Sequence, residues 1–260
     1  MSQSFELIKL YAHTLRLPTL LSCQDVIRQA EETGLSYEDF LSTVLFREIQ
    51  QREENQQKRR VKQAHFPLEK CLDSFEWHHL VHVEAALIWQ LASGDFVKRK
   101  ENVIMIGNPG TGKTHLAIGL GRRLCNQGFK VRYVTASSLA TELVEAQEDR
   151  TLRQLEKILL KVDLLILDEL SYVSFTRAQA ELLFQVLSER NERGSVIITT
   201  NLKILSLDGN VSRYHDDRCF SRSVDPSCSY SQYEWRILPF ERQNQEERIH
   251  SRQYRFKNGR

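Results

Sequence analysis

The amino-acid sequence predicts an α/β protein in which a parallel sheet lies between helical layers, preceded by a helical N-terminal region. Four short apolar runs occupy residues 103–106, 131–136, 164–167 and 196–200. The segments between them carry apolar residues at helical spacing, whereas residues 1–66 contain no strand-like run. Near-continuous apolar strands that alternate with helices are typical of a parallel sheet covered on both faces.

The N-terminal region, residues 1–66, is expected to be helical. Leu20 to Ala30 has helical spacing, and Gly34 ends that segment. Ser36 to Asp39 has the pattern of a capping box and opens a second helix, which becomes charged and continues through Lys62.

The charged end of that second helix is a candidate surface for the phosphate backbone of DNA. The equally weighted alternative is a solvated helix end whose cations suit the helix dipole. The candidate DNA contacts are Arg52, Lys58, Arg59, Arg60 and Lys62.

The second region, residues 67–203, is the predicted α/β domain. Its four apolar runs are the expected strands. The expected helices are residues 115–124, 137–146, 152–162 and 178–190.

A glycine-rich segment between the first strand and the next helix matches G-x-x-x-x-G-K-[ST]. Its strand–loop–helix context is the one that a phosphate-binding loop requires, because backbone N–H groups and a helix N-terminus then surround phosphate oxygens. Lys113 is expected to reach the terminal phosphates of ATP, and the Thr114 hydroxyl to bind Mg²⁺. The loop residues are Gly107, Asn108, Pro109, Gly110, Thr111, Gly112, Lys113 and Thr114.

Polar residues also follow the third and fourth expected strands. Asp168 and Glu169 end the apolar run at 164–167, and Asn201 follows the run at 196–200. Ligands of open parallel sheets bind at the carboxyl ends of the strands. Asp168 is therefore predicted to hold Mg²⁺, Glu169 to polarise the attacking water, and Asn201 to orient that water. Lys113, Glu169 and Asn201 are the candidate catalytic residues for ATP hydrolysis.

Bulk composition limits the choice of partners and compartment. The formal net charge of +2 is too small to indicate nucleic-acid binding by itself. The five cysteines have no C-x-x-C spacing, and residues 1–10 carry an acid and lack the apolar core of a secretory signal. No apolar run approaches the length of a membrane span. A reduced, cytoplasmic protein without membrane contact is expected.

From about Ser36 to Lys203 the chain resembles the AAA+ ATPases of the IstB/DnaC group, and IstB most closely. The resemblance implies ATP-driven self-assembly on double-stranded DNA and contact with a partner transposase. It also adds His115, which follows the loop, to the nucleotide-binding candidates. A DnaC-like helicase loader is the first alternative, and a nucleotide-binding module with little hydrolysis is the second. The resemblance to the IstB/DnaC group is carried by Phe66-Pro67 and by residues 102–104, 115–117, 163–170 and 198–202.

After Lys203 the resemblance ends, and residues 204–260 form an atypical tail without Ala, Thr or Met. The family would continue with segments such as W-T-E-M-F, T-A-A-L and H-A-H-I-L. Back-translation of residues 207–211, 217–220 and 227–240, read one base later, allows these segments in the same order. The tail is therefore predicted to be the product of a one-base frameshift near the Lys203 codon, with genuine divergence as the alternative.

The altered tail has two expected consequences. It lacks the family's arginines of the D-R-L and S-Y-R segments, which the resemblance places near nucleotide, so hydrolysis is expected to be impaired; such an arginine contributes roughly 10³- to 10⁵-fold in related systems. It also lacks H-A-H-I-L, the family's fifth strand. The strand at 103–106 is therefore expected to be an exposed sheet edge.

Overall fold

The structure, a computed structural model, describes residues 3–22, 24–75, 77, 85–170, 175–201 and 236–239. Tertiary contacts divide the chain into two compact units, Met1–Arg59 and Arg60–Arg260. Residues 60–66 group with the second unit, although their composition resembles the N-terminal region. No described helix combines the length and the apolar character that crossing a membrane requires.

The first unit is helical, as predicted. It contains α1 (Gln3–Thr14), the 3₁₀ helix η1 (Pro18–Ser22), α2 (Gln24–Thr33) and most of α3 (Tyr37–Gln63). The helix expected from Leu20 is divided, because the chain forms η1 before α2 begins at Gln24. The capping residue of α3 is confirmed: the Ser36 hydroxyl oxygen accepts the Asp39 N–H at 3.1 Å. The helix α1 lies within the region that was predicted to be helical, although no separate helix was delimited there.

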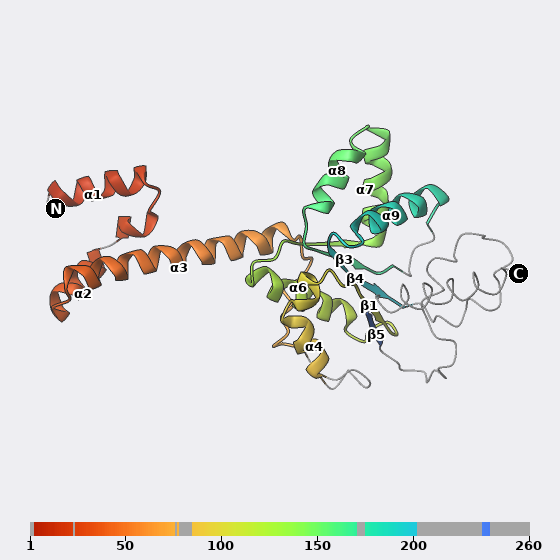
Figure 1. The fold of residues 1–260 in the computed structure, drawn as a ribbon, viewed down its shortest axis with the longest axis horizontal. Helices are drawn as coiled ribbons and strands as arrows, with labels where there is room; N and C mark the ends of the chain where they lie inside the picture. The colour runs from red at the N-terminus through yellow and green to blue at the C-terminus, as the bar shows by residue number, and fades with distance from the viewer. Residues whose placement is uncertain are drawn as a thin grey trace, which may run out of the picture. The chain divides into compact units, whose positions relative to one another are not determined.

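Among the described residues, the second unit is built on a five-stranded sheet with the order β2-β3-β4-β1-β5, of which Figure 1 labels β3, β4, β1 and β5. β2, β3, β4 and β1 are mutually parallel, which confirms the predicted parallel sheet. Its strands are β1 (Val103–Ile106), β2 (Val131–Thr135), β3 (Leu164–Asp168), β4 (Ser195–Thr200) and β5 (Arg236–Pro239). Its helices are α4 (Ala85–Ala92), α5 (Asp95–Lys98), α6 (Lys113–Asn126), α7 (Ala136–Glu148), α8 (Leu152–Leu160) and α9 (Arg177–Arg190).

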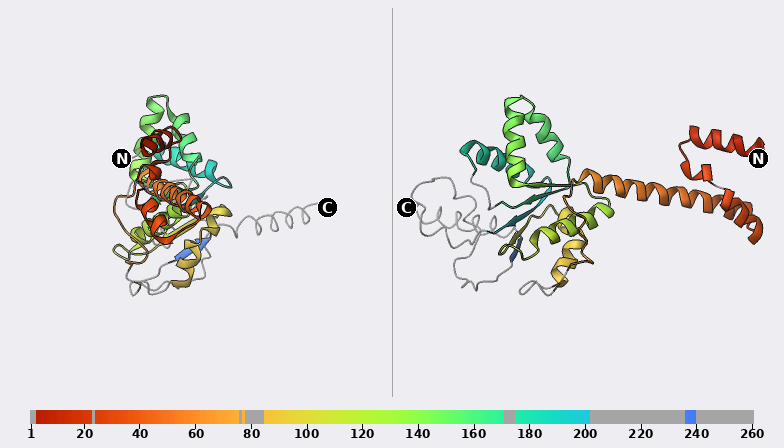
Figure 2. Two further views of the ribbon diagram at one scale, coloured as in Figure 1. Left: turned by 90° about the vertical axis from the view of Figure 1, so that its left-hand side faces the viewer. Right: turned by 180° about the vertical axis from the view of Figure 1, so that it is seen from behind.

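Helices cover both faces of this sheet (Figures 1 and 2), and an apolar core lies on each face. Successive side chains of a strand point to opposite faces. Leu164 and Ile166 of β3 therefore join the core beneath α4 and α6, whereas Leu165 and Leu167 join the core beneath α7, α8 and α9. This double coverage explains why every residue of β3 is buried. It also explains why the strand reads as an unbroken apolar run in the sequence.

The expectation that the strand at 103–106 is an exposed sheet edge is wrong. β5 pairs antiparallel with β1, with Ile104 opposite Leu238 and Met105 opposite Ile237. The backbone of β5 pairs with backbone groups of β1 that an edge strand would leave open, and Pro239 is tolerated because β5 is the last strand in the order of the described sheet. The rest of the predicted frameshifted tail lies outside the described residues.

Candidate nucleotide site

The glycine-rich loop joins β1 to α6 at the carboxyl edge of the sheet. The Gly107 N–H donates to Thr200 O at 3.3 Å, which ties the start of the loop to the end of β4. Gly110 and Gly112 have φ of 78° and 85°, backbone conformations that glycine adopts without steric cost. A Cβ at Gly112 would lie 2.8 Å from Phe75 Cε2. Glycine at position 112 is thus required by both backbone conformation and space.

Lys113, the first residue of α6, is held inside this loop. Its side chain is 7% exposed, and Nζ donates to Gly107 O at 2.8 Å and to Asn108 O at 2.7 Å. Burial lowers the pKa of Lys113 to about 8, although the charge of Asp168 acts in the opposite direction. Loop carbonyls carry only partial charges, so a phosphate group can replace them as a stronger partner for this ammonium.

Asp168, the last residue of β3, is oriented by hydroxyl groups. It is 1% exposed. Its Oδ1 accepts hydrogen bonds from Thr114 Oγ1 at 3.1 Å and from Thr199 Oγ1, and its Oδ2 accepts one from Tyr133 Oη at 2.5 Å. The structure thus brings together Thr114 and Asp168, the two residues expected to bind Mg²⁺. Hydroxyl and carboxylate oxygens are the ligands that Mg²⁺ prefers.

Glu169 differs from its neighbour Asp168 because the backbone turns between them. Glu169 has φ of 60°, a left-handed conformation that is uncommon for residues other than glycine, and it is exposed. Its N–H donates to Thr199 Oγ1 at 2.9 Å, which fixes the turn to β4. Leu167 of β3 pairs with Ile198 of β4, so Glu169 and Asn201 follow the ends of neighbouring strands. An exposed carboxylate at this edge is accessible to water.

The ring of His115 contacts the segment that precedes α4. Its Nε2 lies 3.0 Å from Cys71 O, and its ring meets Phe75 edge-on with centroids 5.1 Å apart. These contacts place His115 beside the loop and anchor it to residues 71–75. A role in nucleotide binding stays a prediction.

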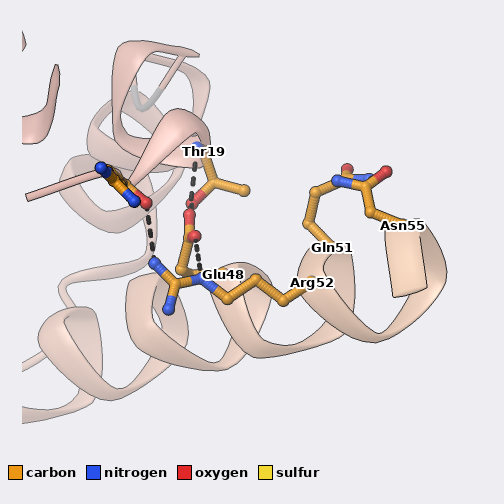
Figure 3. Close-up of polar contacts among 6 residues, drawn as sticks. Thr19, Glu48, Gln51, Arg52 and Asn55 are labelled. Carbon is orange, nitrogen blue, oxygen red and sulfur yellow. Dashed lines mark hydrogen bonds and ion pairs between the residues drawn. The ribbon is translucent and has the colours of Figure 1, made fainter. Parts of the chain in front are cut away.

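The five candidate DNA contacts all lie on α3, but they differ in their partners. The Arg52 guanidinium donates to Glu48 Oε1 and to Arg16 O, both at 2.7 Å (Figure 3). Arg60 Nε donates to Cys125 O at 2.8 Å. These two arginines therefore make tertiary contacts within their own units. The three other cations, Lys58, Arg59 and Lys62, are exposed.

Tyr133 and Thr199 contact Asp168 but are absent from the residues that the sequence singles out. Each lies inside a strand, at a position that periodicity assigns to packing. The available signal was weak: a hydroxyl-bearing side chain within a predicted strand near a predicted site. The sequence alone does not give the strand order, so this signal could not identify Asp168 as the partner of either residue.

Comparison with known proteins identifies the family to which the chain belongs. A family model described as "IstB-like ATP binding protein" matches residues 11–217, and the match continues past Lys203, where the resemblance seen in the sequence ends. The chain is 37% identical over 179 residues to an ATP-binding protein named for insertion sequence IS21 of Pseudomonas aeruginosa, covering 68% of this chain and 67% of the relative.

A second relative is similar over a longer span. It is an ATP-binding protein named for insertion sequence IS5376 of Geobacillus stearothermophilus, 32% identical over 197 residues, with 75% of this chain and 78% of the relative covered. Among solved structures, AMPPCP-bound DnaA from Aquifex aeolicus is similar in fold, with a TM-score of 0.50 and 22% identity. That likeness covers 61% of this chain and 48% of DnaA.

Proposed function

The chain belongs to the family of IstB-like ATP-binding proteins, and we propose that it binds ATP with Mg²⁺, hydrolyses it, and helps a transposase. The observation that carries the proposal is the convergence of Lys113, Thr114 and Asp168 at one edge of the sheet. A buried cation faces the loop that would surround phosphates, and two oxygen ligands lie 3.1 Å apart beside it. That combination suits a magnesium nucleotide better than any neutral ligand.

Nucleotide binding is assigned to the residues of the loop. The α6 N-terminus and the backbone N–H groups of residues 107–114 offer positive potential to phosphate oxygens. Lys113 would exchange its loop carbonyls for the β- and γ-phosphates, and Thr114 with Asp168 would hold Mg²⁺. When bound, Mg²⁺ neutralises charge that develops on the phosphates.

Hydrolysis is assigned to Glu169 and Asn201. Glu169 is exposed at the strand edge, so its carboxylate can accept a proton from water, and Asn201 can orient that water through its amide. General-base catalysis of this kind contributes roughly 10²- to 10⁴-fold.

The biological role is proposed to be assembly on double-stranded DNA, in oligomers, in the cytoplasm, together with a transposase. Both relatives described above carry the names of insertion sequences, which favours transposition over helicase loading. The alternative of a nucleotide-binding module with little hydrolysis depends on the tail, residues 204–260, in which the arginines of the family's D-R-L and S-Y-R segments have no counterpart.

The test of the nucleotide site compares two alanine variants. Lys113→Ala should abolish ATP binding in calorimetry, because it removes the buried cation of the loop. Lys157→Ala removes an exposed lysine of α8 and should bind like the parent. Unchanged affinity in Lys113→Ala would refute the nucleotide site.

The test of hydrolysis uses Glu169→Gln, which keeps the shape of the side chain and removes its basicity. It should retain ATP and lose at least roughly 10²-fold in turnover. A loss of affinity as severe as that of Lys113→Ala would contradict the assigned role.

The tail is tested by removing one base near the Lys203 codon and expressing the restored chain. If residues 204–260 arise from a frameshift, the restored protein should form ATP-dependent oligomers on DNA and hydrolyse ATP faster. The frameshift proposal is overturned if the present 260-residue chain assembles on DNA and hydrolyses ATP as well as the restored chain does. Sequencing the gene around this codon provides an independent check.

A further inference from the structure

Tyr133 of β2 is a buried polar residue that the proposed roles leave unused. The residue is 7% exposed, and its hydroxyl donates a hydrogen bond of 2.5 Å to Oδ2 of Asp168. Asp168 belongs to β3, the strand next to β2. A buried tyrosine hydroxyl needs a partner, but a backbone carbonyl would satisfy it equally well. Here the partner is the carboxylate that the proposed function assigns to Mg²⁺.

The hydroxyl of Tyr133 and those of two threonines contact different oxygens of the Asp168 carboxylate. Thr114 and Thr199 donate to Oδ1, whereas Tyr133 donates to Oδ2. The torsion between Cβ and the carboxyl carbon has broad minima, so a carboxylate held through one oxygen can turn about this bond. Donors at both oxygens restrict that rotation and keep Oδ1 directed toward the hydroxyl of Thr114.

Tyr133 is itself held firmly at both its backbone and its ring. Its N–H donates to Ala64 O at 2.8 Å, immediately after the end of α3. Its ring packs against Phe66, with centroids 6.3 Å apart and an interplanar angle of 55°. The hydroxyl is therefore fixed before any ligand binds, as a group that orients a metal ligand needs to be.

We propose that Tyr133 is a positioning residue that orients Asp168 and thereby strengthens the binding of magnesium nucleotide over metal-free nucleotide. This inference rests on the proposed function, which assigns Asp168 to Mg²⁺. Partners that orient a metal ligand typically change metal affinity about 10- to 100-fold when removed. Asp168 keeps two other donors, so an effect of about tenfold is expected.

The experiment measures the affinity of a non-hydrolysable ATP analogue by calorimetry, with excess Mg²⁺ and separately with EDTA. Tyr133→Phe removes the hydroxyl and keeps the ring. The ratio of the two affinities should fall about tenfold, while affinity in EDTA stays at the parent value. Tyr37→Phe is the matched control, because Tyr37 is 95% exposed and its variant should keep the parent ratio.

A double-mutant cycle separates positioning from packing. In an Asp168→Asn background, Tyr133→Phe should have no further effect on the ratio, since the carboxylate to be oriented is absent. The inference is overturned if Tyr133→Phe keeps the parent ratio. It is also overturned if affinity falls equally with Mg²⁺ and with EDTA, the pattern of a purely structural residue.

Analogue binding to the parent protein, measured with and without Mg²⁺, distinguishes failure of the Tyr133 proposal from failure of the proposed function. If Mg²⁺ strengthens analogue binding to the parent but Tyr133→Phe behaves identically, only the role of Tyr133 fails. If Mg²⁺ has no effect on the parent, the proposed magnesium site fails, and the role of Tyr133 fails with it.

Discussion

Asp168 of the α/β unit and Glu48 of the helical N-terminal unit are both buried carboxylates, but their hydrogen-bond donors differ. Glu48 accepts from the backbone N–H and hydroxyl of Thr19 and from the positively charged guanidinium of Arg52 (Figure 3). Asp168 accepts from three neutral hydroxyls. Lys113, whose charge is near Asp168, donates to carbonyls of the loop.

This difference separates a structural carboxylate from one prepared for a ligand. Arg52 neutralises Glu48 within α3, and the hydrogen bonds that Glu48 accepts from Thr19 tie η1 to α3 in the N-terminal unit. Hydroxyl donors orient Asp168 without neutralising it, and its charge remains available to a cation. Burying an ion without a full counter-charge is costly, and such costs are typical of functional sites.

The largest expected effect follows from removing the charge of Asp168. Asp168→Asn should weaken Mg²⁺-dependent ATP binding about 100-fold or more, since it alters the proposed ligand itself. Its free energy of unfolding without nucleotide should change by less than about 1 kcal/mol, because a neutral amide replaces a buried charge that three hydroxyls and the nearby Lys113 offset only in part. Calorimetry and urea unfolding measure the two quantities. A large loss of stability with intact binding would make Asp168 a structural residue like Glu48.

The converse effect is expected at Glu48. Glu48→Gln should destabilise the N-terminal unit by about 1–2 kcal/mol, because the charged hydrogen bond to Arg52 is lost and half of the Arg52 side chain is solvated. ATP affinity should stay within about twofold of the parent value, well under 1 kcal/mol. Hydrogen exchange of the α3 amides reports the stability. Glu53→Gln, at an exposed position of the same helix, is the control, and an equal loss in that control would contradict the comparison.

A smaller effect is expected for DNA binding. Arg59 and Lys62 are exposed, so their double alanine variant should flatten the salt dependence of DNA affinity by about two units. Replacing Arg52 and Arg60, which donate hydrogen bonds within the chain, should leave that slope unchanged and reduce stability instead. Titrations at several salt concentrations give the slopes. Equal slopes for the parent and both variants would place the DNA surface away from α3.

The smallest expected effect is a pH dependence confined to the N-terminal unit. Burial raises the pKa of Glu48, but hydrogen bonds from Thr19 and Arg52 outweigh it and hold the pKa below the usual 4.5. The carboxylate therefore contributes stability above that pH and loses it as the pH falls through the folded-state pKa. The stability difference between the parent and Glu48→Gln should stay constant near neutral pH and shrink in acid. A constant difference down to strongly acidic pH would contradict the lowered pKa.

The sequence by itself predicted the parallel sheet, the loop and the strand-end carboxylates, because these features are local. Residues 107–114 carry their own glycines, β1 is an apolar run that leads into them, and β3 is a continuous apolar run that ends in Asp168. Burial on both faces imposes that pattern on a central strand whatever surrounds it. The helices at 136–148, 152–160 and 177–190 were predicted within two residues at each end, because the apolar residues of each recur at helical spacing.

Which polar residues contact each other depends on the order of the strands and helices in space. Tyr133 and Asp168 are 35 residues apart and become partners because β2 lies beside β3 in the sheet. Strand order also assigned β5 to the edge that was expected to be open. Hydrogen bonds within the chain distinguish Arg52 and Arg60 from the other cations of α3, and no pattern in the sequence indicated these bonds. Composition and periodicity specify how each segment packs, whereas a side-chain hydrogen bond depends on the position of a second segment, which no local pattern contains.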